Sequence, residues 1–182
     1  MLIRSLIHGV GMLLLVAVVC ECASAAEFQK FYFVGEVKLS TPTGASAGSQ
    51  VILFEKTHDP ANSTMVESAV VVHADGKVEE HTMRAVVTGN TFTIADDAKT
   101  ISGSGTLSGP EWKWTYFKAT YKSTNGAQIE DENFMADDSV ITARKKIMAP
   151  DGKIVLYMDM TLKAITPTTF EILKTGLLRK KN

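Results

Sequence analysis

The amino-acid sequence predicts an all-β protein, a single up-and-down antiparallel barrel of about 8–10 strands that follows a cleaved signal peptide. Three observations support this fold class. From Phe28 onward, segments rich in Val, Ile, Thr and aromatic residues alternate with Gly, Asn, Asp and Pro. No run of ten or more residues shows a helical stripe. A meander of this length removes its open edges by closing on itself.

The predicted strands follow the chain in order and are separated by short turns. They occupy residues 28–39, 50–56, 65–73, 77–87, 91–95, 100–107, 112–122, 127–135, 139–148, 154–164 and 169–173. Gly103 and Gly105 fall inside one of them, where glycine marks a tight bend in a barrel wall. Residues 40–49 are mainly Ser, Thr, Ala and Gly, so we expect a loop there that acts as a mobile lid.

Three dipeptides predict tight hairpins within this meander: Asp75-Gly76, Asn125-Gly126 and Asp151-Gly152. Such dipeptides are favoured in two-residue turns, because both central positions need a positive φ. Side-chain alternation then tests each register, since a slip of one residue turns every side chain to the other face.

The third hairpin has the most regular pattern. A two-residue loop pairs Leu156 with Ile147 on an apolar inner face, and Arg144 with Asp159 on the outer face. The preceding Pro150 also permits a four-residue loop, which keeps the same parity. Either loop predicts the same set of inward-facing residues.

The other two hairpins are less uniform. In the first, a two-residue loop pairs Val70 with His81 on the inner face, so that Val70 and Leu156 both line the barrel. In the second, neither face is cleanly apolar. Either one wall of the barrel is polar inside, or a bulge near Tyr116 and Phe117 switches the faces.

Composition and charge fit a small globular protein and exclude several functions. The 182 residues include 19 Lys and Arg against 20 Asp and Glu, and 45% are hydrophobic. This balance lacks the basic excess of nucleic-acid-binding proteins, and the hydrophobic content excludes disorder. We therefore expect one domain and no nucleic-acid partner.

The first residues have the pattern of an export signal: Arg4, an apolar run over 10–20, and small residues ending at Ala25. Cleavage after Ala25 leaves 26–182 as the barrel domain, with cleavage after Ala26 or an uncleaved anchor as alternatives. The apolar run is too short to span a bilayer. We expect an exported protein, periplasmic or extracellular, with no transmembrane segment in the mature chain.

Both cysteines, Cys20 and Cys22, lie within this signal. The mature chain is therefore expected to have no disulfide. Lipid anchoring at Cys20 is disfavoured, because the bulky Val19 precedes it where such sites prefer a small residue. Asn62 begins an acceptor sequence for N-glycosylation, which matters only in a host that glycosylates exported proteins.

No residue pattern indicates a catalytic or metal site. Residues 44–48 match the Gly-x-Ser-x-Gly pattern of hydrolases, but the helix that this motif requires does not follow Ser46. The predicted register puts His73 and His81 on opposite faces, where they cannot bind one metal together. The acidic run at 130–132 is interpreted as solvated strand charges. We expect no enzyme, no metal and no other cofactor.

Eight residues are instead predicted to line a ligand pocket: His81, Met83, Trp112, Trp114, Tyr116, Lys145, Met158 and Met160. The three aromatic residues alternate on one strand face and form either a pocket wall or core filling. The methionines supply an adaptable apolar lining. Lys145 either meets an anionic ligand group or reaches water at the rim. His81 is either a ligand contact or a satisfied wall residue.

The C-terminal part of the chain resembles the calycin superfamily of lipocalin-like barrels, and within it the secreted bacterial proteins. The resemblance rests on the run Trp112-Lys113-Trp114-Thr115-Tyr116, on Phe134-Met135 with Asp137-Asp138, on Arg144 and on Pro150-Asp151-Gly152-Lys153. It implies a barrel that carries a small molecule. The chain departs from lipocalins in lacking their early Gly-x-Trp, their usual disulfide and a C-terminal helix.

Together these observations predict an exported, non-enzymatic barrel that binds a small apolar or amphipathic ligand. The alternative is a secreted or envelope interaction protein or inhibitor, with a packed interior and functional loops. An enzyme of the same fold is a third hypothesis. A barrel of about eight to ten strands is just wide enough for side chains or for one small ligand.

Overall fold

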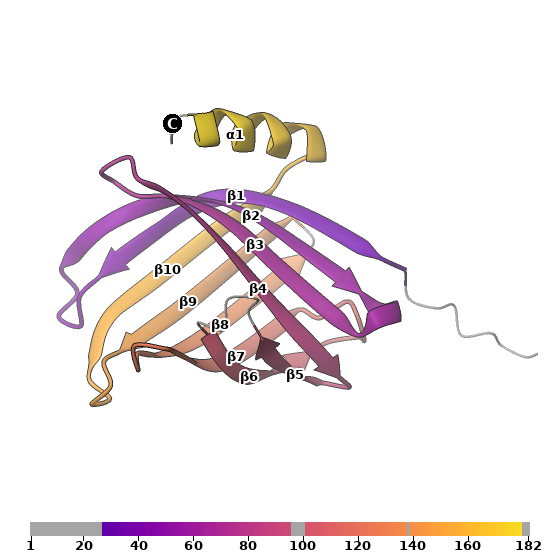
Figure 1. Cartoon of the computed structure of the whole chain (residues 1–182), viewed down its shortest axis with the longest axis horizontal. Coiled ribbons are helices and arrows are strands. Elements are labelled where there is room, and N and C mark those ends of the chain that lie inside the picture. The colour runs from indigo at the N-terminus through magenta and orange to yellow at the C-terminus, as the bar shows by residue number, and fades with distance from the viewer. Residues whose placement is uncertain (1–26, 96–100, 138, 180–182) are drawn as a thin grey trace, which may run out of the picture.

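Ten strands form a closed antiparallel barrel in the computed structural model, which describes residues 27–95, 101–137 and 139–179 (Figure 1). The strands are β1 (Gln29–Ser40), β2 (Ser46–Asp59), β3 (Thr64–Val72), β4 (Val78–Thr88), β5 (Thr91–Ala95), β6 (Ile101–Ser108), β7 (Tyr116–Ser123), β8 (Gln128–Asp137), β9 (Val140–Met148) and β10 (Ile154–Ala164). A short turn, η1 (Pro60–Asn62), and one helix, α1 (Pro167–Arg179), complete the described elements. The predicted signal peptide, with its cleavage site and both cysteines, lies in residues 1–26, outside the described residues.

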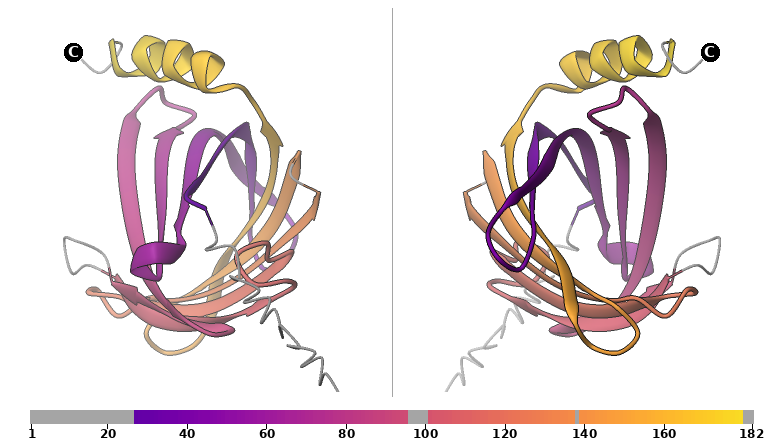
Figure 2. Two further views of the ribbon diagram at one scale, coloured as in Figure 1. Left: turned by 90° about the vertical axis from the view of Figure 1, so that its right-hand side faces the viewer. Right: turned by 90° about the vertical axis from the view of Figure 1, so that its left-hand side faces the viewer.

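Each strand pairs with its neighbours in sequence, and β1 pairs with both β2 and β10 to close the wall. The predicted all-β, up-and-down barrel is thereby confirmed. The predicted loop at 40–49 is shorter than expected and occupies residues 41–45, because β1 extends to Ser40 and β2 begins at Ser46; its role as a lid stays a prediction. Figure 2 shows the strands surrounding the interior, with α1 outside the wall.

All three predicted hairpins form, but their loops contain three residues instead of two. In the first, the His73 amide donates to the Lys77 carbonyl and the Gly76 amide to the His73 carbonyl, each at 2.9 Å. Among the loop residues only the glycine has a positive φ, 85° at Gly76, whereas the predicted turn needs two such residues. The same bonding recurs at Gly126 and Gly152. These are turns in which the glycine forms a bulge at the end of the loop.

The three-residue loop moves the β3–β4 register by one residue. Ala69 lies opposite His81 on the inner side of the wall, and Val70 pairs with Glu80. The prediction that Val70 lines the barrel is therefore wrong. Its side chain points outward and is buried in a cluster with Phe170 of α1.

The same shift of one residue in the β7–β8 hairpin explains why neither face was apolar in the predicted register. Tyr116 pairs with Phe134 on the outer side, whereas Ala119 pairs with Asp131 on the inner side. The inner face of β7 is consequently buried and apolar, and no switch of faces along the strand is needed.

The β9–β10 register is as predicted, with Leu156 opposite Ile147 and Asp159 opposite Arg144. Its loop also contains three residues, but an irregularity between Ile154 and Leu156 adds one residue to β10 and restores the parity. The Arg144 Nε donates to the Asp159 carboxylate at 2.8 Å on the outer face.

The C-terminal segment is a helix, although the sequence predicted a strand at 169–173 and no helix. Thr166 caps it, because its hydroxyl accepts a hydrogen bond from the Thr169 amide at 3.1 Å, and Pro167 begins the first turn. Phe170 packs in a cluster with Leu53 on the outer face of the barrel. This apolar outer patch explains why a helix is retained there. Figure 1 shows α1 outside the barrel, next to β1. No helix within the described residues is long and apolar enough to cross a membrane.

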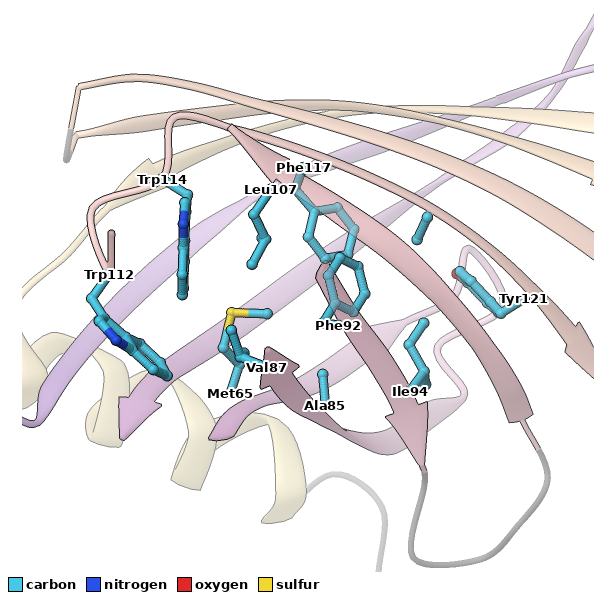
Figure 3. Close-up of a cluster of buried hydrophobic side chains, with 11 residues drawn as sticks. Met65, Ala85, Val87, Phe92, Ile94, Leu107, Trp112, Trp114, Phe117 and Tyr121 are labelled. Carbon is cyan, nitrogen blue, oxygen red and sulfur yellow. The ribbon is translucent and has the colours of Figure 1, made fainter. Parts of the chain in front are cut away.

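Buried apolar side chains lie on both sides of the wall. Inside it, one cluster surrounds Phe92 and Phe117, whose rings stack with centroids 4.7 Å apart (Figure 3). A second inner cluster surrounds Phe33 and Met160. The third lies outside the wall, under α1.

Two glycines have opposite expected responses to replacement by alanine. A Cβ at Gly35 in β1 would lie 2.0 Å from the Thr161 carbonyl oxygen of β10, so Gly35→Ala is expected to lower the free energy of unfolding by about 2 kcal/mol. In α1 nothing lies within 4 Å of a Cβ at Gly176, so Gly176→Ala is expected to raise it by about 0.5–1 kcal/mol. Urea denaturation measures both values. A neutral Gly35→Ala would contradict the close approach of β1 to β10.

Candidate functional site

The barrel encloses a cavity of about 480 Å³, which we call the interior cavity. Its wall is built by inward-facing side chains from most of the strands, and its apolar part includes Val37, Ile52, Ile141, Met158, Met160 and Leu162. This volume and this mainly apolar lining are typical of small-molecule sites.

A partly buried lysine, whose side chain is 23% exposed, lies in the wall of the interior cavity. The Lys145 Nζ of β9 lies 2.8 Å from the Asp131 carboxylate of β8 and 3.3 Å from the Tyr121 hydroxyl of β7. The Asn133 side-chain amide donates to the other Asp131 oxygen at 2.9 Å. Lys145 therefore finds its anionic partner within the protein, a third outcome beside the ligand group and the rim position considered from sequence.

Burial and charge act in opposite directions on this cluster. Burial raises the pKa of the Asp131 carboxyl above its ordinary value, against the attraction of Lys145. Burial would lower the pKa of Lys145, but the facing Asp131 carboxylate and Tyr121 hydroxyl raise it above its ordinary value. Burial also raises the pKa of Tyr121. Lys145 and Tyr121 are thus protonated at neutral pH and able to donate to an oxygen in the cavity.

A second ion pair lies deeper in the barrel. The Lys56 Nζ is 3.3 Å from the Glu67 carboxylate, and both side chains are largely buried. Glu67 lines the interior cavity, while both residues line a void of about 20 Å³ beyond it. The lining of the interior cavity includes four acidic residues, Glu67, Glu79, Glu80 and Asp131, and one lysine, Lys145.

The interior cavity meets solvent near a cluster of two histidines and one carboxylate. His73 Nε2 and His81 Nε2 lie 3.1 and 3.4 Å from the same Glu79 oxygen, and the Gln50 amide contacts His73 Nδ1 at 2.9 Å. The hydrogen bonds from Lys77 and His73 hold the pKa of Glu79 at about 2. His81 is 62% exposed, so this cluster forms the mouth of the cavity.

The mouth corrects the prediction that His73 and His81 lie on opposite faces. Both face inward, because the three-residue loop shifts one strand of the hairpin. Within the described residues, no three His, Cys, Asp or Glu side chains are placed to hold a metal ion. Ser46 of the Gly-x-Ser-x-Gly pattern is exposed at the start of β2, where no helix follows it.

Five of the eight predicted pocket residues line the interior cavity: His81, Met83, Lys145, Met158 and Met160. Their role in binding stays a prediction. The other three, Trp112, Trp114 and Tyr116, do not line this cavity.

The prediction put the three aromatic residues in the wrong place because their segment is not a continuous strand. β7 begins only at Tyr116, and Trp112, with a φ of 60°, lies in a turn in which the Lys113 amide donates to the Pro110 carbonyl. Strand alternation therefore does not apply before Tyr116. Trp112 and Trp114 are buried side by side at one end of the barrel, with ring centroids 4.9 Å apart (Figure 3). Tyr116 faces outward.

Asp131 is the main site residue that sequence reasoning missed. The acidic run around it was interpreted as solvated charges, and Glu130 and Glu132 do face solvent, where they pair with Lys146 and Lys118. Asp131 is 2% exposed and faces inward. Strand alternation could have indicated this, since side chains on a strand alternate between its two faces and Asp131 therefore points away from Glu130 and Glu132.

The fold and the cavity together define a closed, ten-stranded barrel of the lipocalin-like class. No protein-family profile matches the sequence, and no curated protein matches it significantly. Solved structures with a similar fold include a protein of unknown function from the DUF3598 family of Nostoc punctiforme, with a TM-score of 0.57 and 8% identity over 74% of this chain and 47% of that one. This chain thus spans about half the length of that protein.

A second similar structure is an S-type phycobiliprotein lyase from Guillardia theta, with a TM-score of 0.51 and 10% identity over 75% of this chain and 87% of that one. At this identity the likeness shows the fold alone. The expectation of a non-enzymatic protein is contradicted by this comparison, because a barrel of the same fold is a lyase. The absence of a recognisable catalytic motif was an insufficient reason to exclude catalysis.

Proposed function

We propose that the barrel binds one small amphipathic molecule in its interior cavity. The observation that carries the proposal is a volume of about 480 Å³ with a mainly apolar wall and a few convergent polar groups. A carrier and an enzyme of this fold both begin with this binding step. The lipocalin-like resemblance in the C-terminal part of the sequence agrees with it.

The wall indicates what kind of molecule fits. Its apolar body packs against Met83, Met158 and Met160, whose flexible side chains adapt to irregular shapes. The Lys145 ammonium and the Tyr121 hydroxyl donate to an oxygen of the ligand. Because the wall already has more acidic than basic side chains, an uncharged carbonyl or hydroxyl group fits there better than a carboxylate, whose charge would be buried without a counter-ion.

The alternative function, a secreted interaction protein or inhibitor with a packed barrel, has less support. A packed interior would leave no space of this size between the strands. The proposed site of action is outside the cytoplasm, in the periplasm or the extracellular space, and this part of the proposal rests on the signal-peptide pattern of the sequence.

Filling the cavity is expected to weaken binding strongly without unfolding the protein. Ala69 lines the cavity from β3, and Ala69→Phe places a ring in the space that the ligand needs. Titration with N-phenyl-1-naphthylamine, an uncharged dye that fluoresces in apolar surroundings, should show saturable binding to the wild type. We expect an affinity loss of about tenfold or more in Ala69→Phe, which corresponds to about 1.4 kcal/mol.

The matched control places the same ring on the other side of the wall. Val86 is 47% exposed on the outer face of β4, so Val86→Phe should bind the dye as the wild type does. Native mass spectrometry of protein purified from its source would identify a retained ligand by its mass. A wild type that takes up no dye and carries no ligand would refute the proposed function.

A further inference from the structure

The end of the barrel opposite the mouth has a pocket of its own. It measures about 360 Å³, and we call it the end pocket. Phe31, His58, Trp112 and Trp114 form its aromatic wall, and Lys30 and Lys113 line it as well. None of its lining residues lines the interior cavity. The two spaces are therefore separate sites.

The aromatic wall surrounds one histidine on several sides. The His58 ring lies edge-on to Phe31 and Trp114, with centroids at 5.4 and 5.6 Å, and 6.2 Å from Trp112. Trp112 adopts a φ of 60°, a conformation that is strained for a bulky residue and that the surrounding structure must hold. Flat aromatic faces held in this way are suited to stacking against a flat ligand.

The His58 ring is buried without a hydrogen bond of regular geometry. The residue is 2% exposed, and among the described residues its ring nitrogens have only a marginal contact with the Trp112 backbone. The indole N–H of Trp114, which lines the same pocket, is also buried without an acceptor. Such groups are costly unless a ligand or an ordered water pairs with them. Burial and the nearby Lys56 lower the pKa of His58 to about 4, although the Trp112 backbone partly offsets this. The neutral ring therefore offers one donor and one acceptor.

The charged residues of the end pocket have one sign. Lys30 and Lys113 line it, and none of the described residues that line it is acidic. Lys30 is already paired with Glu55 at 2.9 Å. Lys113 is exposed and makes no ion pair with a described residue, so it remains available to an anion that approaches the pocket.

We propose that the end pocket binds a flat aromatic carboxylate. Its ring stacks against Trp112 and Trp114, its carboxylate faces Lys113, and His58 pairs with a polar atom at the buried edge of the ligand. The end pocket is a different site from the interior cavity, and this proposal does not depend on the proposed function of that cavity.

The two tryptophans provide a direct readout, because the chain contains only two and both line this pocket. We would titrate the barrel with 4-nitrobenzoate, which quenches indole fluorescence on contact, and with the uncharged 4-nitrobenzamide. Saturable quenching is expected, with about fivefold tighter binding of the carboxylate. Lys113→Glu should remove this preference. Lys122→Glu makes the same charge change on an exposed residue at the other end of β7 and should leave it intact.

Two further variants separate this proposal from others. His58→Phe keeps an aromatic ring but removes both nitrogens, and it is expected to weaken 4-nitrobenzoate binding. Ala69→Phe, which fills the interior cavity, should leave the quenching unchanged whatever it does to dye uptake. The proposal is overturned if 4-nitrobenzoate gives no saturable quenching, if the amide binds equally well, or if Lys113→Glu binds the carboxylate as the wild type does.

Discussion

Lys145→Met is expected to lower the free energy of unfolding by about 3–5 kcal/mol at pH 7, the cost of leaving a buried charge without its partner. The variant removes the ammonium 2.8 Å from Asp131, whose side chain is 3% exposed. One hydrogen bond from Asn133 would remain, which does not replace a counter-ion. Urea denaturation followed by circular dichroism measures the loss.

The neighbouring residue is a matched control. Lys146 pairs with Glu130 on the outer face at 2.7 Å, and both side chains are about two-fifths exposed. Lys146→Met is expected to cost less than about 1 kcal/mol, as for other exposed ion pairs. The double variant Lys145→Met/Asp131→Leu should recover most of the loss, because it removes both charges together. Equal losses for the two single lysine variants would contradict the burial of the Asp131 carboxylate that Lys145 neutralises.

The same variant has an expected pH dependence. Burial already raises the pKa of Asp131, and loss of Lys145 raises it further. A carboxyl whose folded-state pKa exceeds its unfolded-state value destabilises the fold above the unfolded-state pKa and ceases to do so once it is protonated. The deficit of Lys145→Met should therefore shrink as the pH falls from 7 toward 4.

The barrel itself could be predicted because its signals are repeated along the whole chain. Segments rich in β-branched and aromatic residues recur from Phe28 onward, and short turns leave no room for crossover helices, so an error in one strand does not change the closure. Register is more fragile. Asp75-Gly76 fits a two-residue turn as well as a three-residue loop, and the single residue of difference decides whether Val70 or Ala69 faces inward.

The candidate site was predictable where a strand was assigned its correct inward face, which includes His81 and Met83 of β4 although their register with β3 was wrong. Met158, Met160 and Lys145 were placed correctly because a bulge in β10 compensates for the unexpected loop. Asp131 was missed because its hairpin was shifted by one residue. Trp112 was misplaced for another reason, since its backbone leaves the strand conformation altogether.

The helix α1 was missed because its first turn is unfavourable for a helix when considered alone. Thr168 and Thr169 are β-branched, and such residues favour strands. What decides its structure is the Thr166 cap together with a partner surface on the outer face of the barrel, around Leu53 and Val70. That surface becomes apparent only in the corrected register, so tertiary packing overrides the local preference.

Acidification provides a test of the buried histidine at the end of the barrel. The pKa of His58 falls from 6.5 in the unfolded chain to about 4 in the folded one, chiefly because of burial. The unfolded state therefore binds more protons between these values, and stability falls as the pH drops through that window. At about 1.4 kcal/mol for each pKa unit, His58 alone should lower the free energy of unfolding by roughly 3 kcal/mol between pH 7 and pH 4.

Replacement of the ring isolates this contribution from those of the carboxyl groups. His58→Phe retains the packing against Phe31 and Trp114 but has no titrating group, so its stability should fall less between pH 7 and pH 4. At pH 7 it should be at least as stable as the wild type, because two unpartnered nitrogens are removed from the interior. His81→Phe makes the same substitution at a side chain that is 62% exposed and serves as the control. If His58→Phe and the wild type lose stability in parallel on acidification, His58 is not held neutral in the folded protein.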